Sequence, residues 1–317
     1  MKRKILITSR SFGKIDDTPC GILQEAGYEI TNIGASFDQA AFERMVPDYD
    51  ALIIGAHEFP QETMERCKRL KIICKHGVGL DNIHLEKARE LGIAVCNAPG
   101  TNSNAVADLT FGLMLSAARN IQRSSLNVLK NAPQSVIGVD VCCKTLGLLG
   151  FGAVAKCVAR RAKGFSMKVL AYDPYVKEVP REFAGDVTLS GLDELLRSCD
   201  YLSIHIPLTE ETHYMIGAAQ LASMKAGSIL VNTARGGIVD EKALYDALVS
   251  GHIAAAAMDV VEHEPVTADH PLLRLDNVII TPHVGMYSRE AINAVGLICA
   301  QNAAAYALGK PLQHQVV

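Results

Sequence analysis

Short runs of apolar, often β-branched residues alternate along the chain with longer segments in which apolar residues recur at helical spacing. The short runs are nearly continuous, as expected for parallel strands covered by helices on both faces. Strands are predicted at residues 4–8, 51–55, 72–74, 94–97, 145–149, 168–172, 201–206, 228–232, 253–259 and 277–281. This rhythm predicts an α/β chain with two doubly wound, Rossmann-like domains built on parallel sheets, the first of them flavodoxin-like.

A long apolar helix is predicted over residues 104–119, opened by Ser103 or Asn104 as a cap and followed by a polar stretch at residues 120–134. It links the two domains, and the first strand of the second domain begins near residue 144. A closing helix over residues 291–308 can return to the first domain. We therefore expect a discontinuous first domain, residues 1–100 with 286–317, and a second domain of residues 101–285.

The composition limits the possible partners. The chain has 317 residues, 49% of them hydrophobic, which supplies core for two domains. A net charge of −3 and a pI of about 6.4 provide no basic surface for nucleic acid or an anionic membrane. No uncharged apolar stretch approaches the roughly 18–20 residues of a membrane helix. We expect a soluble globular protein without a nucleic-acid or membrane partner.

The nine cysteines include no Cys-x-x-Cys pair. Most fall in apolar runs, as do Cys74, Cys96, Cys157 and Cys299. This distribution predicts reduced core thiols in a cytoplasmic protein. The adjacent pair Cys142-Cys143 could be redox-active, but packing in the core is the favoured interpretation. No ligand spacing suits zinc, so no metal is expected.

A glycine turn follows the first strand of the second domain. Gly150 and Gly152 open an Ala/Val-rich helix through Ala153 and Val154, which is the context of a dinucleotide-binding G-x-G-x-x-G/A fingerprint with Ala155 in the third place. Gly150 would allow the tight turn, and Gly152 would let a pyrophosphate approach the amides of the helix N-terminus. A structural turn in any βα unit explains the motif alone about equally well.

Asp173 ends the next strand, about 20 residues past the turn, where an acid can bind the ribose hydroxyls of a dinucleotide. A carboxylate there repels a 2′-phosphate, and no Arg or Lys follows at residues 174–176. NAD is therefore favoured over NADP. The alternative is a surface aspartate that opens the turn at Pro174.

Three residues further along suit hydride transfer from an alcohol that neighbours a carboxylate. His283 follows a strand and is the candidate base. Glu264, held in a loop by Pro265, can fix the imidazole in one tautomer. Arg235 offers a planar fork for a carboxylate. The alternatives are a structural histidine, a solvated loop glutamate beside Glu262, and an interdomain salt bridge for the arginine.

In the first domain, a glycine-rich turn follows the strand at residues 72–74 and contains Lys75, Val78 and Gly79. Its closely spaced backbone amides could form a nest for a substrate carboxylate. Without the other segments, a glycine-rich turn alone would be the better interpretation.

Together these segments resemble the D-isomer-specific 2-hydroxyacid dehydrogenase family over essentially the whole chain. The matching stretches are residues 76–83, the glycine fingerprint, residues 205–209 with Glu211 and Thr212, and residues 232–240, 259–265 and 281–285. The chain is most similar to the phosphoglycerate dehydrogenase-like members, including at residues 97–100 and 102–109.

The resemblance implies that Arg235 binds and polarises the substrate, that His283 is the acid/base and that Glu264 tunes His283. It implies an NAD site that includes Pro207, Thr212, Thr233, Ala234, Asp259 and Gly285. It also implies a homodimer formed through the nucleotide-binding domains.

The chain departs from the phosphoglycerate-specific pattern in several places. Those members usually carry an arginine after the strand at residues 51–54, where this chain has Gly55, Ala56 and His57, which puts phosphoglycerate in doubt. The Gly-x-Trp signature before the second domain is missing, and Met286 and Tyr287 replace smaller residues. With a length of 317 residues, we do not expect the C-terminal regulatory domain of longer phosphoglycerate dehydrogenases.

The sequence therefore predicts an NAD-dependent dehydrogenase of a small (R)-2-hydroxy acid, of the phosphoglycerate, hydroxypyruvate or glyoxylate type, with the substrate between the two domains. One alternative is an NAD-binding regulator or corepressor on the same fold with little turnover. Another is an oxidoreductase with an unusual donor such as phosphite or formate.

Overall fold

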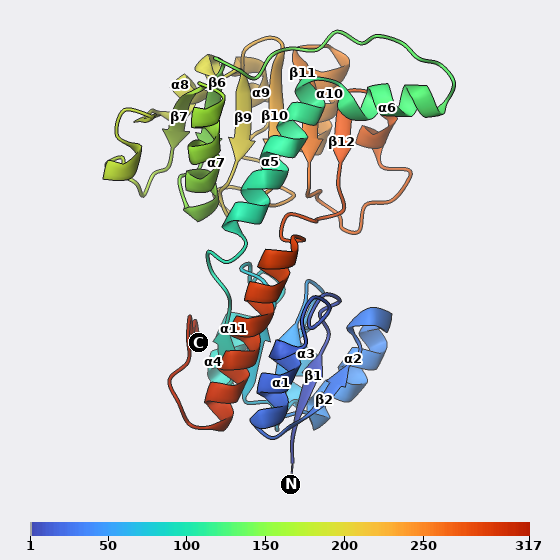
Figure 1. The fold of residues 1–317 in the computed structure, drawn as a ribbon, viewed down its shortest axis with the longest axis vertical. Helices are drawn as coiled ribbons and strands as arrows, with labels where there is room; N and C mark the ends of the chain where they lie inside the picture. The colour runs from blue at the N-terminus through green and yellow to red at the C-terminus, as the bar shows by residue number, and fades with distance from the viewer. Residues whose placement is uncertain (1) are drawn as a thin grey trace. The chain divides into compact units, whose positions relative to one another are not determined.

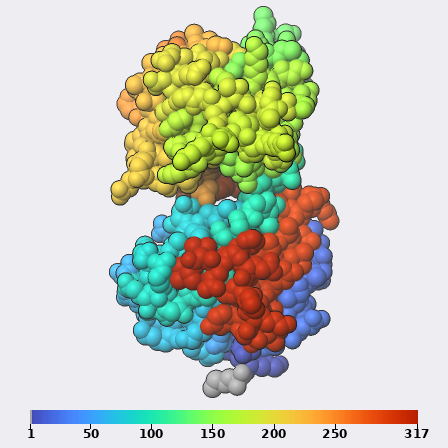
Figure 2. Space-filling view, turned by 90° about the vertical axis from the view of Figure 1, so that its left-hand side faces the viewer, coloured from blue at the N-terminus to red at the C-terminus, as the bar shows by residue number. Residues whose placement is uncertain are grey.

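The computed structural model describes residues 2–317, which divide into two compact units. One unit runs to Asn102 and resumes at Met286–Val317, and the other is Ser103–Gly285. In Figure 1 the closing helix α11 (Arg289–Ala307, red) lies alongside α1 (Thr18–Glu25, blue) in the first unit. Figure 2 shows the same red segment at the surface, next to the blue and cyan residues of that unit.

The first unit has a five-stranded parallel sheet in the order β2-β1-β3-β4-β5, the order of flavodoxin-like folds. Its strands are β1 (Arg3–Ile7), β2 (Tyr28–Asn32), β3 (Ala51–Ile54), β4 (Ile72–Lys75) and β5 (Ala94–Cys96). Besides α1 and α11, its helices are α2 (Gln39–Met45), α3 (Gln61–Arg66) and α4 (Leu85–Glu90), with short 3₁₀ turns η1 (Gly34–Ser36) and η2 (Val46–Asp48).

The second unit has a seven-stranded parallel sheet in the order β12-β11-β10-β9-β6-β7-β8, a Rossmann order extended by one strand. Its strands are β6 (Thr145–Leu149), β7 (Lys168–Tyr172), β8 (Val187–Leu189), β9 (Tyr201–Ile204), β10 (Ser228–Asn232), β11 (Ile253–Met258) and β12 (Val278–Ile280). Its helices are α5 (Ser103–Ala118), α6 (Ile121–Leu129), α7 (Ala153–Gly164), α8 (Leu192–Ser198), α9 (Ala218–Ser223) and α10 (Glu241–Val249), with η3 (Arg181–Phe183) and η4 (Pro271–Arg274).

The strands are apolar throughout because both faces of each sheet are covered. In β1, Ile5 and Ile7 pack in a core with α1 and α11, whereas Leu6 packs in the opposite core with α2 and α3. In the second unit, Leu148 joins the core under α5 and α7, and its neighbour Leu149 joins the core under α8 and α10. Successive side chains point to opposite faces of a strand, so a strand between two helix layers needs apolar residues at every position.

The predicted fold class is confirmed, and every predicted strand forms with ends that differ by at most two residues. Strands β2 and β8 were not predicted, because only their first residues, Tyr28 and Val187, are buried and neither strand shows a continuous apolar run. The stretch at residues 120–134 is not only polar loop: its first part forms the helix α6. The predicted helix at residues 291–308 corresponds to α11, which Ser288 caps by accepting a hydrogen bond from the amide of Ala291 at 3.1 Å.

The cysteines follow the prediction with one exception. Cys74, Cys96, Cys157 and Cys299 are buried free thiols. The expectation that Cys142 and Cys143 pack in the core is wrong, since both are exposed. They occupy a turn ahead of β6 that stays at the surface. Among residues 2–317, no helix is long and apolar enough to cross a membrane, and no group of three or more His, Cys, Asp or Glu side chains is arranged to hold a metal ion.

Candidate active site

The glycine turn between β6 and α7 leaves its backbone open. Gly150 has a φ of +94°, and a Cβ there would come within 2.7 Å of the carbonyl oxygen of His205, so only glycine fits. Gly152 has open space where a Cβ would stand. Within the part of the chain that the structure describes, the amides of Gly152, Ala153 and Val154 have no acceptor. These donors at the positive end of a twelve-residue helix form a cradle that fits a pyrophosphate.

Asp173, directly after β7, holds the glycine turn in place. One carboxylate oxygen accepts from the amide of Phe151 at 2.9 Å, and the other accepts from the amide of Tyr175 at 2.9 Å. The second bond is the surface turn that was the alternative interpretation of this residue. The first bond holds the carboxylate against the cradle, so its negative charge lies beside the glycine turn.

The loop that carries Arg235 is built by Asn232, the last residue of β10. Its side-chain oxygen accepts from the amide of Ala234 at 3.0 Å, and its side-chain nitrogen donates to the carbonyl of Arg235 at 2.8 Å. The Arg235 guanidinium donates to the carbonyl of Ala234 at 2.7 Å. Gly236 leaves no room for a side chain, because a Cβ there would collide with the carbonyl of Val261. The backbone around the guanidinium is therefore fixed on both sides.

A second buried polar residue, Asp259, builds the loop that carries His283. Asp259 follows β11 and is 1% exposed. Its carboxylate accepts from the hydroxyl of Thr281 at 2.6 Å and from the amides of Val284 at 2.8 Å and Gly285 at 2.7 Å. Burial raises the pKa of Asp259, and these hydrogen bonds offset only part of that effect. The side chain thereby connects β11 to the segment after β12.

His283 and Glu264 form a close pair. The Nδ1 atom of His283 lies 2.7 Å from a carboxylate oxygen of Glu264, and the two side chains are 41% and 36% exposed. The backbone of His283 has a φ of +53°, which is uncommon outside glycine, and its amide donates to the carbonyl of Asp259 at 2.9 Å. The neighbouring Glu262 accepts instead from the hydroxyl of Tyr214 at 3.1 Å. Glu264 is therefore not merely solvated, and Nε2 is the ring nitrogen left to exchange a proton with a ligand.

The remaining residues expected near a cofactor lie in this unit at the carboxyl edge of its sheet. Thr233 is buried and shares a hydrogen bond of 3.0 Å with Thr110 of α5. Thr212 accepts from the amide of Thr209 at 2.7 Å and donates to the carbonyl of Pro207 at 2.7 Å, which closes the loop after β9. Gly285 packs close to the Asp259 carboxylate: a Cβ there would lie 3.1 Å from its oxygen.

The first unit has its own polar cluster where β1, β3 and β4 end. Lys75 is buried and donates to the carbonyl of Gly55 at 2.8 Å and to the side-chain oxygen of Asn82 at 2.6 Å. Among residues 2–317, neither the Val78 nor the Gly79 amide donates a hydrogen bond to another group. Both amides therefore remain available to a ligand, and the anion nest stays a prediction.

Sequence reasoning gave no role to Asn232 or Thr281, although both shape the loops that carry the candidate reactive residues. For Asn232, the sequence did contain an indication of this role. A buried asparagine at the end of an apolar strand has no strand partner for its amide, so it is expected to organise the following turn.

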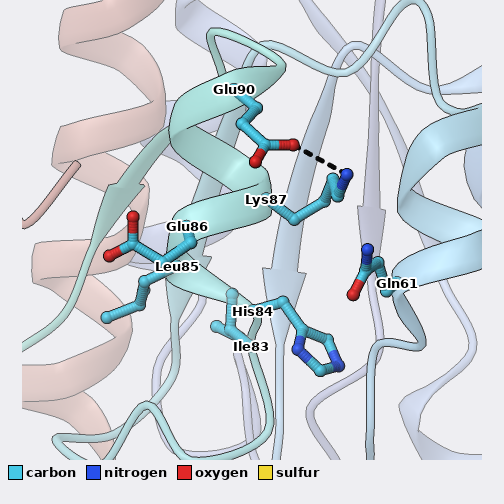
Figure 3. A pocket seen from close by; sticks show the side chains of 7 residues that line it. All are labelled: Gln61, Ile83, His84, Leu85, Glu86, Lys87 and Glu90. Carbon is cyan, nitrogen blue, oxygen red and sulfur yellow. Dashed lines mark ion pairs between the residues drawn. The ribbon is translucent and has the colours of Figure 1, made fainter.

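A cavity of about 390 Å³ in the first unit contains none of these residues. It lies over the start of α4, lined by Gln61, Ile83, His84, Leu85, Glu86, Lys87 and Glu90 (Figure 3). Its one cation, Lys87, is already engaged by Glu90 at 2.7 Å and by Glu65 at 3.0 Å. The cavity therefore offers no unmatched charge to an anionic ligand.

Comparison with known proteins assigns a family to this arrangement. A model described as "D-isomer specific 2-hydroxyacid dehydrogenase, NAD binding domain" matches residues 111–285. A D-3-phosphoglycerate dehydrogenase of Methanocaldococcus jannaschii is 40% identical over 301 residues, which cover 94% of this chain and 56% of that protein. A hydroxypyruvate reductase of Thermotoga maritima is 43% identical over 261 residues, 80% of this chain and 83% of that protein.

Among solved structures, the TT0316 protein from Thermus thermophilus superposes with a TM-score of 0.90 at 35% identity, covering 99% of this chain and 100% of that one. The chain spans a little over half the length of the phosphoglycerate dehydrogenase that it matches.

Proposed function

The chain belongs to the D-isomer-specific 2-hydroxyacid dehydrogenase family, and on this premise we propose that it transfers hydride between NAD and a small (R)-2-hydroxy acid or its 2-oxo acid. The observation that carries the proposal is the His283–Glu264 pair, with 2.7 Å between Nδ1 and the carboxylate. NAD, when bound, supplies the hydride acceptor or donor. The amides of Gly152, Ala153 and Val154 would hold its pyrophosphate.

The residues of the chain supply proton transfer and charge. In oxidation, the Nε2 atom of His283 takes the proton of the C2 hydroxyl, and in reduction the protonated ring returns it. Glu264 holds Nδ1, which orients the ring and balances the positive charge of the imidazolium. Arg235 binds the substrate carboxylate and polarises the C2 oxygen. The remaining cofactor contacts are assigned to Pro207, Thr212, Thr233, Ala234, Asp259 and Gly285, as the family resemblance implies.

We assign the preference for NAD over NADP to Asp173. Its carboxylate is fixed beside the glycine turn by the amide of Phe151 at 2.9 Å. A fixed negative charge there accepts hydrogen bonds from ribose hydroxyls and repels a 2′-phosphate.

The polar cluster of the first unit supports a small, unphosphorylated substrate, such as glyoxylate or hydroxypyruvate. Val78 and Gly79 offer amides to a carboxylate. At the end of β3, Nδ1 of His57 donates to the carbonyl of Glu58 at 3.0 Å, and Nε2 lies 2.7 Å from the hydroxyl of Thr8. Burial lowers the pKa of His57 to about 4, so its ring is neutral near pH 7 and adds no positive charge for a phosphate.

The test is NADH consumption with a panel of 2-oxo acids: glyoxylate, pyruvate, hydroxypyruvate, 3-phosphohydroxypyruvate and 2-oxoglutarate, with NADPH in parallel. We expect turnover with NADH on at least one unphosphorylated acid and weaker use of NADPH. Higher kcat/KM for the phosphorylated acid than for hydroxypyruvate would refute the substrate assignment alone. Tight NADH binding without turnover on any acid would refute the dehydrogenase and favour a regulator or an unusual donor.

We further propose a cytoplasmic homodimer formed through α6 and the segment after it. Helix α6 has no buried residue, and its Leu129 is 76% exposed, while Ile137 in the following segment is 96% exposed. Apolar surface of this kind favours association. Light scattering should give a dimer that Leu129→Asp converts to a monomer, whereas Val249→Asp, at a 60% exposed site on α10, keeps the dimer. A monomeric unmodified chain would contradict this.

A further inference from the structure

The two exposed cysteines, Cys142 and Cys143, have no place in the proposed reaction. They are adjacent in sequence, and their Sγ atoms lie 3.4 Å apart. Of the other seven cysteines, Cys20 is half-buried, and Cys67, Cys74, Cys96, Cys157, Cys199 and Cys299 are buried. The pair therefore forms the one place among residues 2–317 where two thiols are both close together and open to solvent.

The turn that carries the pair is anchored on several sides. The amide of Lys144 donates to the carbonyl of Val141 at 3.3 Å, and the amide of Cys143 donates to the carbonyl of Phe165 at 3.0 Å. The hydroxyl of the buried Tyr201 donates to the carbonyl of Asp140 at 2.8 Å. Cys143 has a φ of +62°, a left-handed conformation that this bonding maintains. The contact between the two thiols thus belongs to a fixed turn.

We propose that Cys142 and Cys143 form a vicinal dithiol site that a small-molecule disulfide oxidises to a disulfide within the chain. The thiolate of one cysteine attacks a sulfur of the external disulfide, whose S–S bond breaks and releases one thiolate. The second cysteine then attacks the mixed disulfide and releases the other thiolate. The two cysteines lose two electrons and two protons, and the external disulfide becomes two thiols.

The product is expected to be readily reduced. Adjacent Cα atoms lie about 3.8 Å apart across a trans peptide, which is shorter than the roughly 4.4–6.8 Å that disulfides usually span. A disulfide under such constraint is more oxidising than a relaxed one and belongs to the labile class. The site would therefore cycle between dithiol and disulfide.

The pair lies apart from the candidate active site of its unit. It precedes the first residue of β6, Thr145, whereas the glycine turn at Gly150 follows the last residue. The carboxyl edge of the sheet, which carries Arg235 and His283, is the opposite edge. Oxidation is therefore expected to leave dehydrogenase turnover within about twofold, since none of the proposed reacting groups is touched.

The test is treatment of the reduced, folded protein with glutathione disulfide, followed by intact and peptide mass spectrometry. We expect a chain that has lost two hydrogens and carries no adduct, with the bond mapped to Cys142–Cys143 and reversed by dithiothreitol. In C142S or C143S the remaining thiol should keep one glutathione, while C20S should behave as the unmodified protein. A stable glutathione adduct on the unmodified protein, a bond between two chains, or no reaction would each overturn the proposal.

A second experiment tests, without oxidising the thiols, whether the two sulfur atoms lie close together. Phenylarsine oxide binds stably only where two thiols reach one arsenic atom. One arsenical per folded chain is expected, retained in C20S and lost in both C142S and C143S. Binding that survives either of these two substitutions would overturn the assignment, and circular dichroism of each variant shows whether it is folded.

Discussion

Replacing Asp259 by asparagine tests whether this buried carboxylate positions His283. The substitution preserves the shape of the side chain and exchanges one acceptor oxygen for an NH₂ group. If the amide oxygen faces Thr281 and Val284, the NH₂ group faces the amide of Gly285, which loses its acceptor at 2.7 Å. The opposite orientation removes the acceptor of both Thr281 and Val284. The first orientation is therefore favoured, and the loop is released at one of its three attachments.

The structure sets the expected magnitudes. One buried amide without an acceptor costs about 1–3 kcal/mol. Because the asparagine side chain buries no charge, part of that cost is offset, so the variant should fold with a loss of at most about 3 kcal/mol. The effect of the substitution on kcat should be larger than its effect on stability. A displacement of about 1 Å in a reacting group costs on the order of 10²-fold in rate, and the amide of His283 is bonded to this same residue at 2.9 Å.

The assay is steady-state kinetics on the best substrate of the 2-oxo acid panel, combined with NADH binding by fluorescence titration. Asp259→Asn should lower kcat by on the order of 10²-fold with NADH affinity changed less than about threefold. The matched control is Asp246→Asn, at a 63% exposed side chain on α10, which should change neither quantity. Loss of NADH affinity with kcat preserved would refute the positioning role and leave Asp259 only the cofactor contact that the family resemblance implies.

The other predictions concern pH, proton transfer and cofactor choice. Since burial raises the pKa of Asp259 above 3.8, its contribution to folding is fully present below 3.8 and is lost as the pH rises through the folded value. Urea unfolding should therefore show that the free energy of unfolding of the unmodified protein rises relative to that of Asp259→Asn as the pH is lowered. A relative fall on acidification would mean that hydrogen bonding affects the pKa of Asp259 more than burial does. His283→Gln should lower kcat by roughly 10²–10⁴-fold with NADH binding intact, and a loss of only a few-fold would exclude it as the acid/base. Asp173→Asn should raise the ratio of kcat/KM for NADPH to that for NADH by about tenfold, since roughly 1.4 kcal/mol of repulsion is removed; an unchanged ratio would show that another residue sets the preference.

The sequence predicted the central parts of both sheets well, because strands between two helix layers are apolar at every position. Leu146, Leu148 and Leu149 illustrate this, since they are buried on alternate faces of β6. Strands β2 and β8 give a weaker signal. In β2 only Tyr28 is buried, and β8 has three residues, so neither shows a continuous apolar run. Helix α6 was not predicted within the polar stretch at residues 120–134, because it buries nothing and polar residues interrupt its apolar positions.

The exposure of Cys142 and Cys143 could not be predicted from the residue type, because cysteine is usually buried. They lie in a turn in which Cys143 has a left-handed backbone conformation. Glycine and asparagine adopt this conformation more often than cysteine does. Two of the bonds that hold this turn come from Phe165 and Tyr201, far along the chain, and so leave no local pattern.

In the candidate site, too, some features follow from the local sequence and others from contacts between distant residues. His283, Glu264 and Arg235 were predicted because reactive residue types stand after strands in short, punctuated segments. The approach of Glu264 to His283 at 2.7 Å, across a separation of nineteen residues, follows from the adjacency of β11 and β12 in the sheet. Sequence reasoning named Glu264 as the partner of the ring, with a solvated glutamate beside Glu262 as the alternative, but the distance between the two side chains depends on the fold.

Asn232 and Asp259 explain how loops at this edge become rigid enough for catalysis. Where parallel strands end, the backbone ladder stops and the next amides need acceptors. Asn232 supplies one to Ala234, and Asp259 supplies two to Val284 and Gly285, while the amide of Asp259 itself donates to the carbonyl of Asn232 at 2.8 Å. Each side chain therefore fixes one loop, Asn232 that of Arg235 and Asp259 that of His283, and the backbone bond between the two residues joins the loops. A change of the Asn232 side chain should therefore displace chiefly Arg235, and a change of the Asp259 side chain chiefly His283, because the bond that joins the two loops is made by the backbone and survives either substitution.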